Sequence, residues 1–177
     1  MTPELLHEYR KRAVAWLEHD CAGNPKLNSP QHLVVTEGRK GKRYSSCGDL
    51  AHRLYYRIGV RSNWINRDEH QGWKVGVNVS LLVTQSIAYT KQRLEGGDVI
   101  IVANRWPSGE DAHVICIVDQ LEDKLLATAE SGLPGNGLQN RKLPMRRKIR
   151  VVLPLEQILT EAELDGHLVA PEELEVI

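Results

Sequence analysis

Residues 44–59 read YSSCGDLAHRLYYRIG, which is a polar approach, a cysteine and an amphipathic helix that ends at a glycine. Ser46 and Asp49 have capping-box spacing, so Ser46 is the predicted N-cap and Cys47 falls in the first helical turn. Unpaired N–H groups and a partial positive charge at a helix start favour thiolate over thiol. Cys47 is therefore a candidate nucleophile. It also lies one turn before the apolar Leu50, so it reads equally as a small buried residue.

The bulk composition describes one ordinary globular domain. The chain has 177 residues, of which 41% are hydrophobic and 26% charged. We expect a single domain over 1–177, with an N-terminal helix and loop (1–43), a catalytic core (44–153) and a C-terminal helix and tail (154–177). Basic and acidic residues number 23 each, so net charge predicts no attraction to nucleic acid or to an anionic membrane surface.

The cysteines and histidines predict no metal and no cofactor. Cys21, Cys47 and Cys116 are an odd number with no C-x-x-C motif, which disfavours both a disulfide framework and a zinc site. Free thiols in a reducing compartment are the simpler interpretation. His52 and His70 lack ligand-type spacing, and the chain has no glycine-rich phosphate loop.

The N-terminal residues are charged and amphipathic, with no apolar signal core, and no apolar run approaches the ~20 residues that span a bilayer. We expect synthesis in the cytoplasm without a signal peptide. Any delivery to the periplasm or cell wall would then take a signal-independent route.

The periodicity of apolar residues predicts an α+β fold. A long polar loop with two tryptophans, 60–79, is interpreted as a substrate-facing wall. Helices are predicted over 3–20, 46–58, 80–92 and 154–164, and strands over 98–104, 111–119, 125–130 and 149–153.

Two of these strands form a predicted hairpin with His113 at its mouth. Alternation places His113, Ile115 and Ile117 on one face, so Cys116 points away and fills core. A turn centred between Leu121 and Glu122 would set His113 directly opposite Glu130, where a carboxylate could hold the imidazole in one tautomer. A slip of one residue would separate the two groups.

Cys47, His113 and Glu130 thus form a candidate nucleophile, base and orienter for covalent acyl transfer. The Cys47 backbone N–H is one candidate oxyanion donor and Tyr44 another. His70 is a competing base. Polar-tipped aromatic residues are candidate substrate-binding walls, namely Trp64, Trp73 and Trp106.

The order of motifs resembles the papain-like CHAP and NlpC/P60 superfamily. The matching pieces are Ser46-Cys47-Gly48-Asp49-Leu50-Ala51 and its helix, Gly97-Asp98-Val99-Ile100, Ala112-His113-Val114-Ile115-Cys116-Ile117-Val118, and Ala129-Glu130. The resemblance implies N-terminal helices packed on a central antiparallel β-sheet, with Cys47, His113 and Glu130 as the triad. It also implies hydrolysis of peptidoglycan amide bonds, as an endopeptidase or N-acetylmuramoyl-L-alanine amidase.

Two alternatives stay open at this stage. One is a cysteine peptidase or isopeptidase that acts on a protein substrate. The other is a catalytically silent papain-like binding or assembly module, which Ser46 and Asp49 beside the cysteine favour. The expected partners are peptidoglycan or a peptide substrate, with an immunity or delivery protein for a wall enzyme exported without a signal peptide.

Overall fold

The computed structural model describes residues 1–21, 47–61, 86–106, 112–122, 125–130, 139–144 and 148–174. Within these ranges, the backbone alone is described for residues 20–21, 47–49, 52–53 and 139–144.

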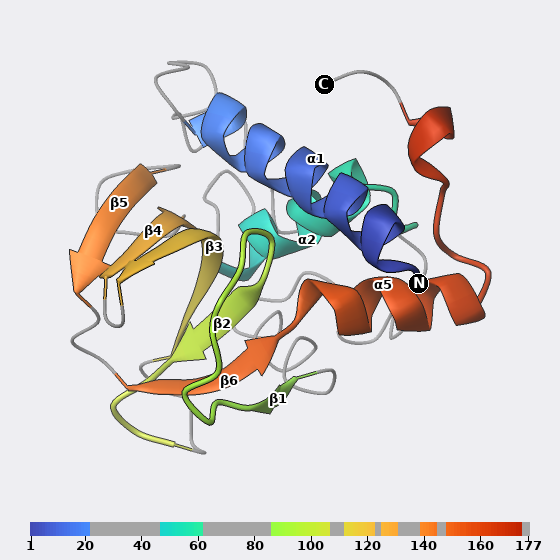
Figure 1. The fold of residues 1–177 in the computed structure, drawn as a ribbon. Coiled ribbons are helices and arrows are strands. Elements are labelled where there is room, and N and C mark those ends of the chain that lie inside the picture. Colours follow the sequence, from blue (N-terminus) through green and yellow to red (C-terminus); the bar gives the residue numbers. More distant parts are fainter. Residues whose placement is uncertain are drawn as a thin grey trace, which may run out of the picture.

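The fold is α+β, as the sequence predicts, with helices packed on an antiparallel sheet (Figure 1). Six strands follow the order β1-β6-β2-β3-β4-β5, and every neighbouring pair is antiparallel. The elements are α1 (Pro3–Cys21), α2 (Cys47–Arg57), β1 (Ile87–Ala88), β2 (Val99–Val102), β3 (His113–Glu122), β4 (Leu125–Glu130), β5 (Gln139–Pro144), β6 (Ile149–Leu153), α5 (Leu155–Leu164) and the 3-10 helix η3 (Pro171–Glu173).

Helices α1 and α2 begin and end where their local chemistry favours it. Thr2 caps α1, since its Oγ1 accepts a hydrogen bond from the Leu5 N–H at 3.2 Å. Leu50 and Leu54 form part of the buried stripe of α2. The chain turns away after α2 at Gly59, whose φ of 112° a residue with a side chain rarely adopts.

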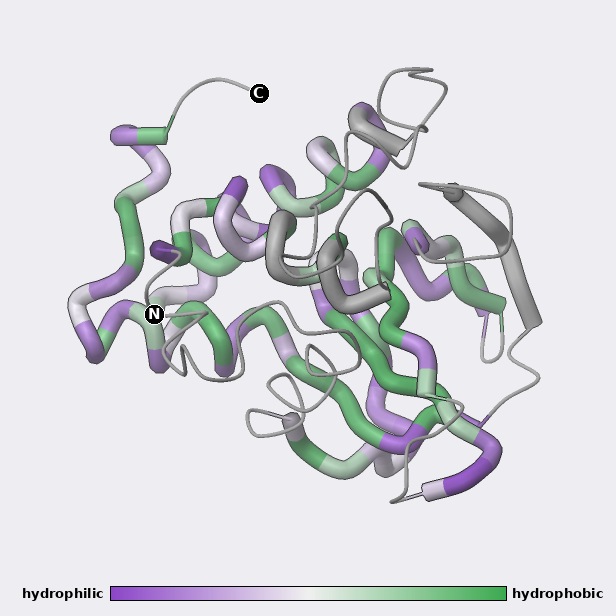
Figure 2. The backbone as a smooth tube through the Cα atoms, turned by 180° about the vertical axis from the view of Figure 1, so that it is seen from behind, coloured by the Kyte–Doolittle hydropathy of each residue, from purple (hydrophilic) through white to green (hydrophobic). Residues whose placement is uncertain are grey.

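The two faces of the sheet bury different clusters. The larger cluster, here called the helix-side core, joins α1, α2 and α5 to alternate strand residues that include Val99, Val114 and Cys116. The smaller cluster, the far-side core, takes the intervening strand positions. Its buried members are Leu94, Ile100, Val102, Ile115, Ile117, Leu126 and Val152. The central strands are therefore apolar on both faces, and Figure 2 shows them as long hydrophobic stretches.

Asp98 joins three elements just before β2. Its side chain is only 6% exposed. Its Oδ1 accepts hydrogen bonds from Arg10 Nη1 on α1 and from the Leu155 N–H at the start of α5, both at 3.0 Å. Its Oδ2 accepts from the Glu95 N–H at 2.9 Å. The preceding Pro154 provides no side-chain cap, so Asp98 caps α5 from another element.

Two predictions of secondary structure differ from the structure. The helix predicted over 80–92 is wrong from residue 86 onward, because Ile87–Ala88 form strand β1 beside β6. Lys91 adopts a φ of 64°, which a helix does not allow. Strand β5 was not predicted, because its sequence Gln139–Pro144 is polar and basic and does not alternate. The apolar residues Leu33, Val34 and Val35 also suggest a short strand over 33–36, which lies outside the described residues.

Candidate active site

His113 and Glu130 are in direct contact in the interior of the sheet. His113 Nε2 and Glu130 Oε1 are 2.9 Å apart. The residues are 8% and 0% exposed respectively. The Thr128 hydroxyl, also buried, donates to Glu130 Oε2 at 2.6 Å. Each carboxylate oxygen of Glu130 therefore has its own donor, which a buried carboxylate requires.

The contact forms in a register that differs from the predicted one. The sequence placed His113 directly opposite Glu130, whereas the β3–β4 ladder pairs Ile117 with Thr128 and Cys116 with Ala129. Continuing that ladder sets Ile115 opposite Glu130, so His113 is the diagonal neighbour of the carboxylate. Diagonal neighbours on one face are roughly 7–8 Å apart at Cα, which is within reach of long side chains. The error is two residues, and an even shift keeps both groups on the same face.

The predicted register failed because the hairpin turn lies further along the chain. Strand β3 extends to Glu122 and β4 begins at Leu125. Two irregularities in β3, between Ile117 and Asp119 and between Gln120 and Glu122, each shift the ladder by a residue. Such bulges leave no clear mark in a sequence that alternates imperfectly.

The bond geometry fixes which ring nitrogen of His113 does which task. A carboxylate accepts hydrogen bonds, so Nε2 donates to Glu130 and a neutral ring then carries its basic lone pair on Nδ1. The distance of 2.6 Å from Thr128 Oγ1 to Glu130 Oε2 is typical of a hydroxyl that donates to an ionised carboxylate. The arrangement suits a base that cycles between neutral imidazole and imidazolium.

The start of α2 lies toward the same end of the sheet as His113. Tyr55 of α2 is buried in the helix-side core with Cys116. Burial, followed by the electrostatic effects of Cys116 and Asp98, raises the pKa of Tyr55 well above its usual value. Beyond Tyr55 the chain leads to Val60, which bridges to Leu168 after α5. The end of α2 therefore lies toward α5, and the start of α2 lies toward the other end of the sheet, where His113 is.

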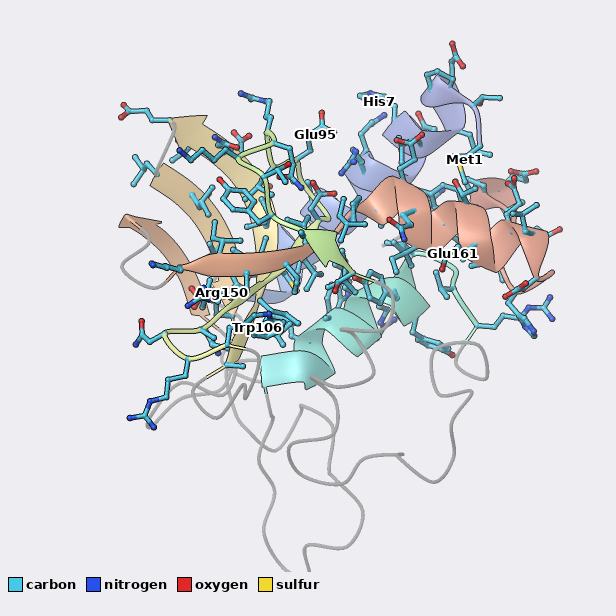
Figure 3. All side chains as sticks on the ribbon, turned by 90° about the horizontal axis from the view of Figure 1, so that it is seen from below. Met1, His7, Glu95, Trp106, Arg150 and Glu161 are labelled. Atoms are coloured by element: carbon cyan, nitrogen blue, oxygen red, sulfur yellow. The ribbon has the colours of Figure 1, made fainter. Side chains whose placement is uncertain are left out.

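The length of α2 from Tyr55 back to Cys47 is similar to the length of β3 from Cys116 back to His113. Cys47 precedes Tyr55 by about 12 Å of helix at ~1.5 Å per residue. His113 precedes Cys116 by about 10 Å of strand at ~3.4 Å per residue. Figure 3 shows the start of α2 beside the labelled Trp106, which follows β2 at the His113 end.

His113 and α2 nevertheless belong to opposite faces of the sheet. His113 pairs with Val102, which is a member of the far-side core. Leu50 of α2 packs in the helix-side core. A contact between the Cys47 thiol and His113 therefore has to form around the end of β3, where His113 is the first strand residue. The sequence did not predict that His113 and α2 lie on opposite faces. Alternation shows which hairpin residues share a face, but it does not show which face the helix covers.

Trp106 is the predicted wall residue that the structure describes. Its side chain is half-buried and packs against the helix-side core. The turn before it is fastened to β6, because Arg150 donates from Nε to the Ala103 carbonyl and from Nη2 to the Asn104 carbonyl, both at 2.9 Å (Figure 3). Arg150 was not singled out in the sequence, where it reads as one more charged strand residue.

The structure describes only some of the other residues discussed in the sequence analysis. Cys47 is the first residue of α2, and its backbone alone is described. Cys116 is a buried cysteine on the helix-side face, away from His113, as predicted. Tyr44, Trp64, His70 and Trp73 lie outside the described residues.

The described part of the chain lacks both a metal-binding cluster and a membrane-spanning helix. No group of three or more histidine, cysteine or acidic side chains could hold a metal ion there. In the same part of the chain, no helix has the length and apolar character to cross a membrane.

Comparison with known proteins finds no matching family model, no matching curated protein and no matching solved structure. The resemblance to the CHAP and NlpC/P60 superfamily therefore rests on the motifs and on the residues described above.

Proposed function

We propose that the protein is a cysteine-dependent amide hydrolase, with Cys47 as nucleophile, His113 as base and Glu130 as the residue that orients His113. The observation that carries the proposal is the buried hydrogen bond of 2.9 Å between His113 and Glu130. A histidine held by a carboxylate at the end of the sheet where a cysteine opens a helix is the arrangement that acyl transfer needs. It supplies a base, fixes the tautomer of that base and favours a thiolate.

In the proposed mechanism, His113 takes the proton of the Cys47 thiol, and the resulting thiolate attacks the carbonyl carbon of the amide. The C–N bond breaks, and the amine leaves with the proton that His113 donates. His113 then takes a proton from water, and the resulting hydroxide attacks the thioester carbonyl. The C–S bond breaks, which releases a carboxylic acid and restores Cys47. Glu130 keeps its charge throughout and stabilises the imidazolium that forms in each half of the cycle.

The substrate class proposed first is peptidoglycan peptide and amide bonds, on the strength of the motif resemblance. An amide in a protein or isopeptide is the alternative substrate for the same chemistry. Purified protein assayed with muropeptides, peptides and isopeptides separates the two, because the substrate that is cleaved identifies itself.

The test of the nucleophile is the variant Cys47→Ala, with Cys116→Ala as the matched control. Cys47→Ala is expected to lose cleavage of whichever substrate the wild type cleaves, and to keep a similar thermal melt. Cys116→Ala removes a buried thiol from the helix-side core, so it is expected to lower stability by about 1 kcal/mol and to keep activity. Cleavage by Cys47→Ala at the wild-type rate would refute the assignment.

A second candidate is a non-enzymatic scaffold for binding or assembly. The position of His113 on the sheet face away from α2 favours it, because a purely structural His113–Glu130 pair needs no cysteine nearby. Iodoacetamide at pH 6 separates the candidates. A nucleophilic Cys47 reacts faster than a model thiol and slows when His113 is replaced by Ala, whereas a scaffold cysteine does neither.

A further inference from the structure

We propose that Thr128 is a positioning residue of the site, and that its hydroxyl holds the Glu130 carboxylate in the orientation that directs His113. This inference rests on the proposed function. It adds a residue that no sequence motif singles out, because a threonine in a strand is ordinary.

The contacts distinguish the two oxygens of Glu130. Oε1 meets His113 Nε2 at 2.9 Å, and Oε2 meets Thr128 Oγ1 at 2.6 Å. Thr128 and Glu130 are two residues apart on one strand, so their side chains share a face. With both oxygens engaged, rotation of the carboxylate about its terminal bond would break both hydrogen bonds. Thr128 therefore restricts the angle at which Oε1 faces the imidazole.

The surroundings make this restraint effective. Thr128 is 1% exposed and Glu130 is fully buried, so the packed side chains leave little room for water to replace the hydroxyl. A threonine in a strand has few accessible χ1 rotamers, which keeps its hydroxyl aimed at the neighbouring carboxylate. Glu130 has several side-chain torsions of its own and gains its fixed position from these partners.

The consequence for chemistry is indirect. Thr128 does not contact the reacting atoms in the proposed mechanism. It acts by keeping Glu130 aligned with Nε2, which keeps Nδ1 of His113 as the ring nitrogen that exchanges protons with the nucleophile and the leaving amine. Loss of the hydroxyl is expected to affect the reactivity of the site more than ground-state binding of a substrate.

The experiment compares four proteins: wild type, Thr128→Val, Thr128→Ser and Ile117→Val. Valine keeps the shape of threonine without the hydroxyl, and serine keeps the hydroxyl. Ile117 faces Thr128 across the ladder and its replacement loosens packing without touching a hydrogen bond. Two readouts are used. One is the NMR signal of the His113 Nε2 proton, assigned by its absence in His113→Ala. The other is the rate of Cys47 alkylation by iodoacetamide at pH 6.

The proposal expects Thr128→Val to lose the slowly exchanging Nε2 proton signal and to slow alkylation by about tenfold. Thr128→Ser and Ile117→Val are expected to keep the signal and to react within about threefold of wild type, which is well short of the roughly hundredfold or larger contribution of a general base. The proposal is overturned if Thr128→Val keeps the signal, or if Ile117→Val loses it equally. The proton signal is independent of catalysis. A wild-type Cys47 no faster than a model thiol would refute the proposed function, while the signal would still decide the role of Thr128.

Discussion

Replacement of Asp98 by alanine is expected to destabilise the fold strongly, because one carboxylate joins α1, β2 and α5. The variant removes the acceptor for the Leu155 N–H, the Glu95 N–H and Arg10. A buried donor left without an acceptor costs about 1–3 kcal/mol. Arg10 keeps the Gly96 carbonyl and the Glu95 carboxylate as partners, which limits its share of the loss. We therefore expect about 3 kcal/mol of lost unfolding free energy.

The matched control is Glu95→Ala, because Glu95 pairs with the same arginine. The distance from Arg10 Nη2 to Glu95 Oε2 is 3.1 Å, but the Glu95 side chain is 56% exposed. An exposed ion pair contributes little, so its loss is expected to cost no more than about 0.5 kcal/mol. Asp98→Asn is expected to fall between the two, because its remaining oxygen still accepts but its amide group presents a donor to a donor.

The assay is urea unfolding followed by tryptophan fluorescence, to which the buried Trp16 contributes, with the slope of free energy against urea checked for constancy. Hydrogen exchange at the Leu155 amide adds a local readout, which should quicken in Asp98→Ala and stay slow in Glu95→Ala. Equal destabilisation by the two alanine variants would refute the account of Asp98 as a buried junction. A loss below about 1 kcal/mol for Asp98→Ala would do the same.

Two further predictions concern pH and backbone geometry. Burial, then the charge of Glu163, raises the pKa of Tyr9 from 10.0 to about 12, so its neutral form contributes stability in full below pH 10 that is lost as pH rises through 12. Alkaline denaturation should show a loss of about 2–3 kcal/mol over this window, reduced in Tyr9→Phe; an unchanged pH dependence in that variant would contradict the assignment. Gly97→Ala should cost about 2–4 kcal/mol in thermal melts, because its φ is 90° and a Cβ would lie 2.8 Å from Leu155 Cδ2. Gly166→Ala, at φ 73° and with no atom of the described residues within 4 Å of the added Cβ, should cost only about 1 kcal/mol. An equal loss in both variants would argue against the contact with Leu155.

The sequence was sufficient for elements whose pattern is strong and local. The helix that begins at Cys47 and the buried strands at Val99–Val102 and His113–Glu122 follow from periodicity and from flanking glycines. The pairing of His113 with Glu130 was also predictable as a contact. The contact was predicted correctly although the register was wrong, because the register differed by two residues. A shift of two residues leaves both side chains on the predicted face.

Other features depended on tertiary context that a local pattern does not contain. The short strand at Ile87–Ala88 exists because β6 offers a partner, and its residues are exposed. The face of the sheet that α2 covers is set by packing among three helices, so the sequence could not place His113 relative to that helix. Arg150 donates hydrogen bonds to two backbone carbonyl oxygens, and Thr128 donates one to a carboxylate oxygen. No sequence motif indicates either arrangement.

The bulged ladder between β3 and β4 has a consequence for how this hairpin tolerates insertions and deletions. His113 and Glu130 meet only while their side chains lie on the same face, so a register shift of one residue between β3 and β4 would separate them. Strand β4 is also paired along its length with β5. Substitutions along the hairpin leave the register between β3 and β4 unchanged. Deletion of Ala127 would turn Glu130 toward the helix-side core unless another bulge formed, and would take its carboxylate away from His113. Functional variants of this hairpin should therefore differ by exchanged side chains within β4, and by added or missing residues only in the turn that follows Glu122.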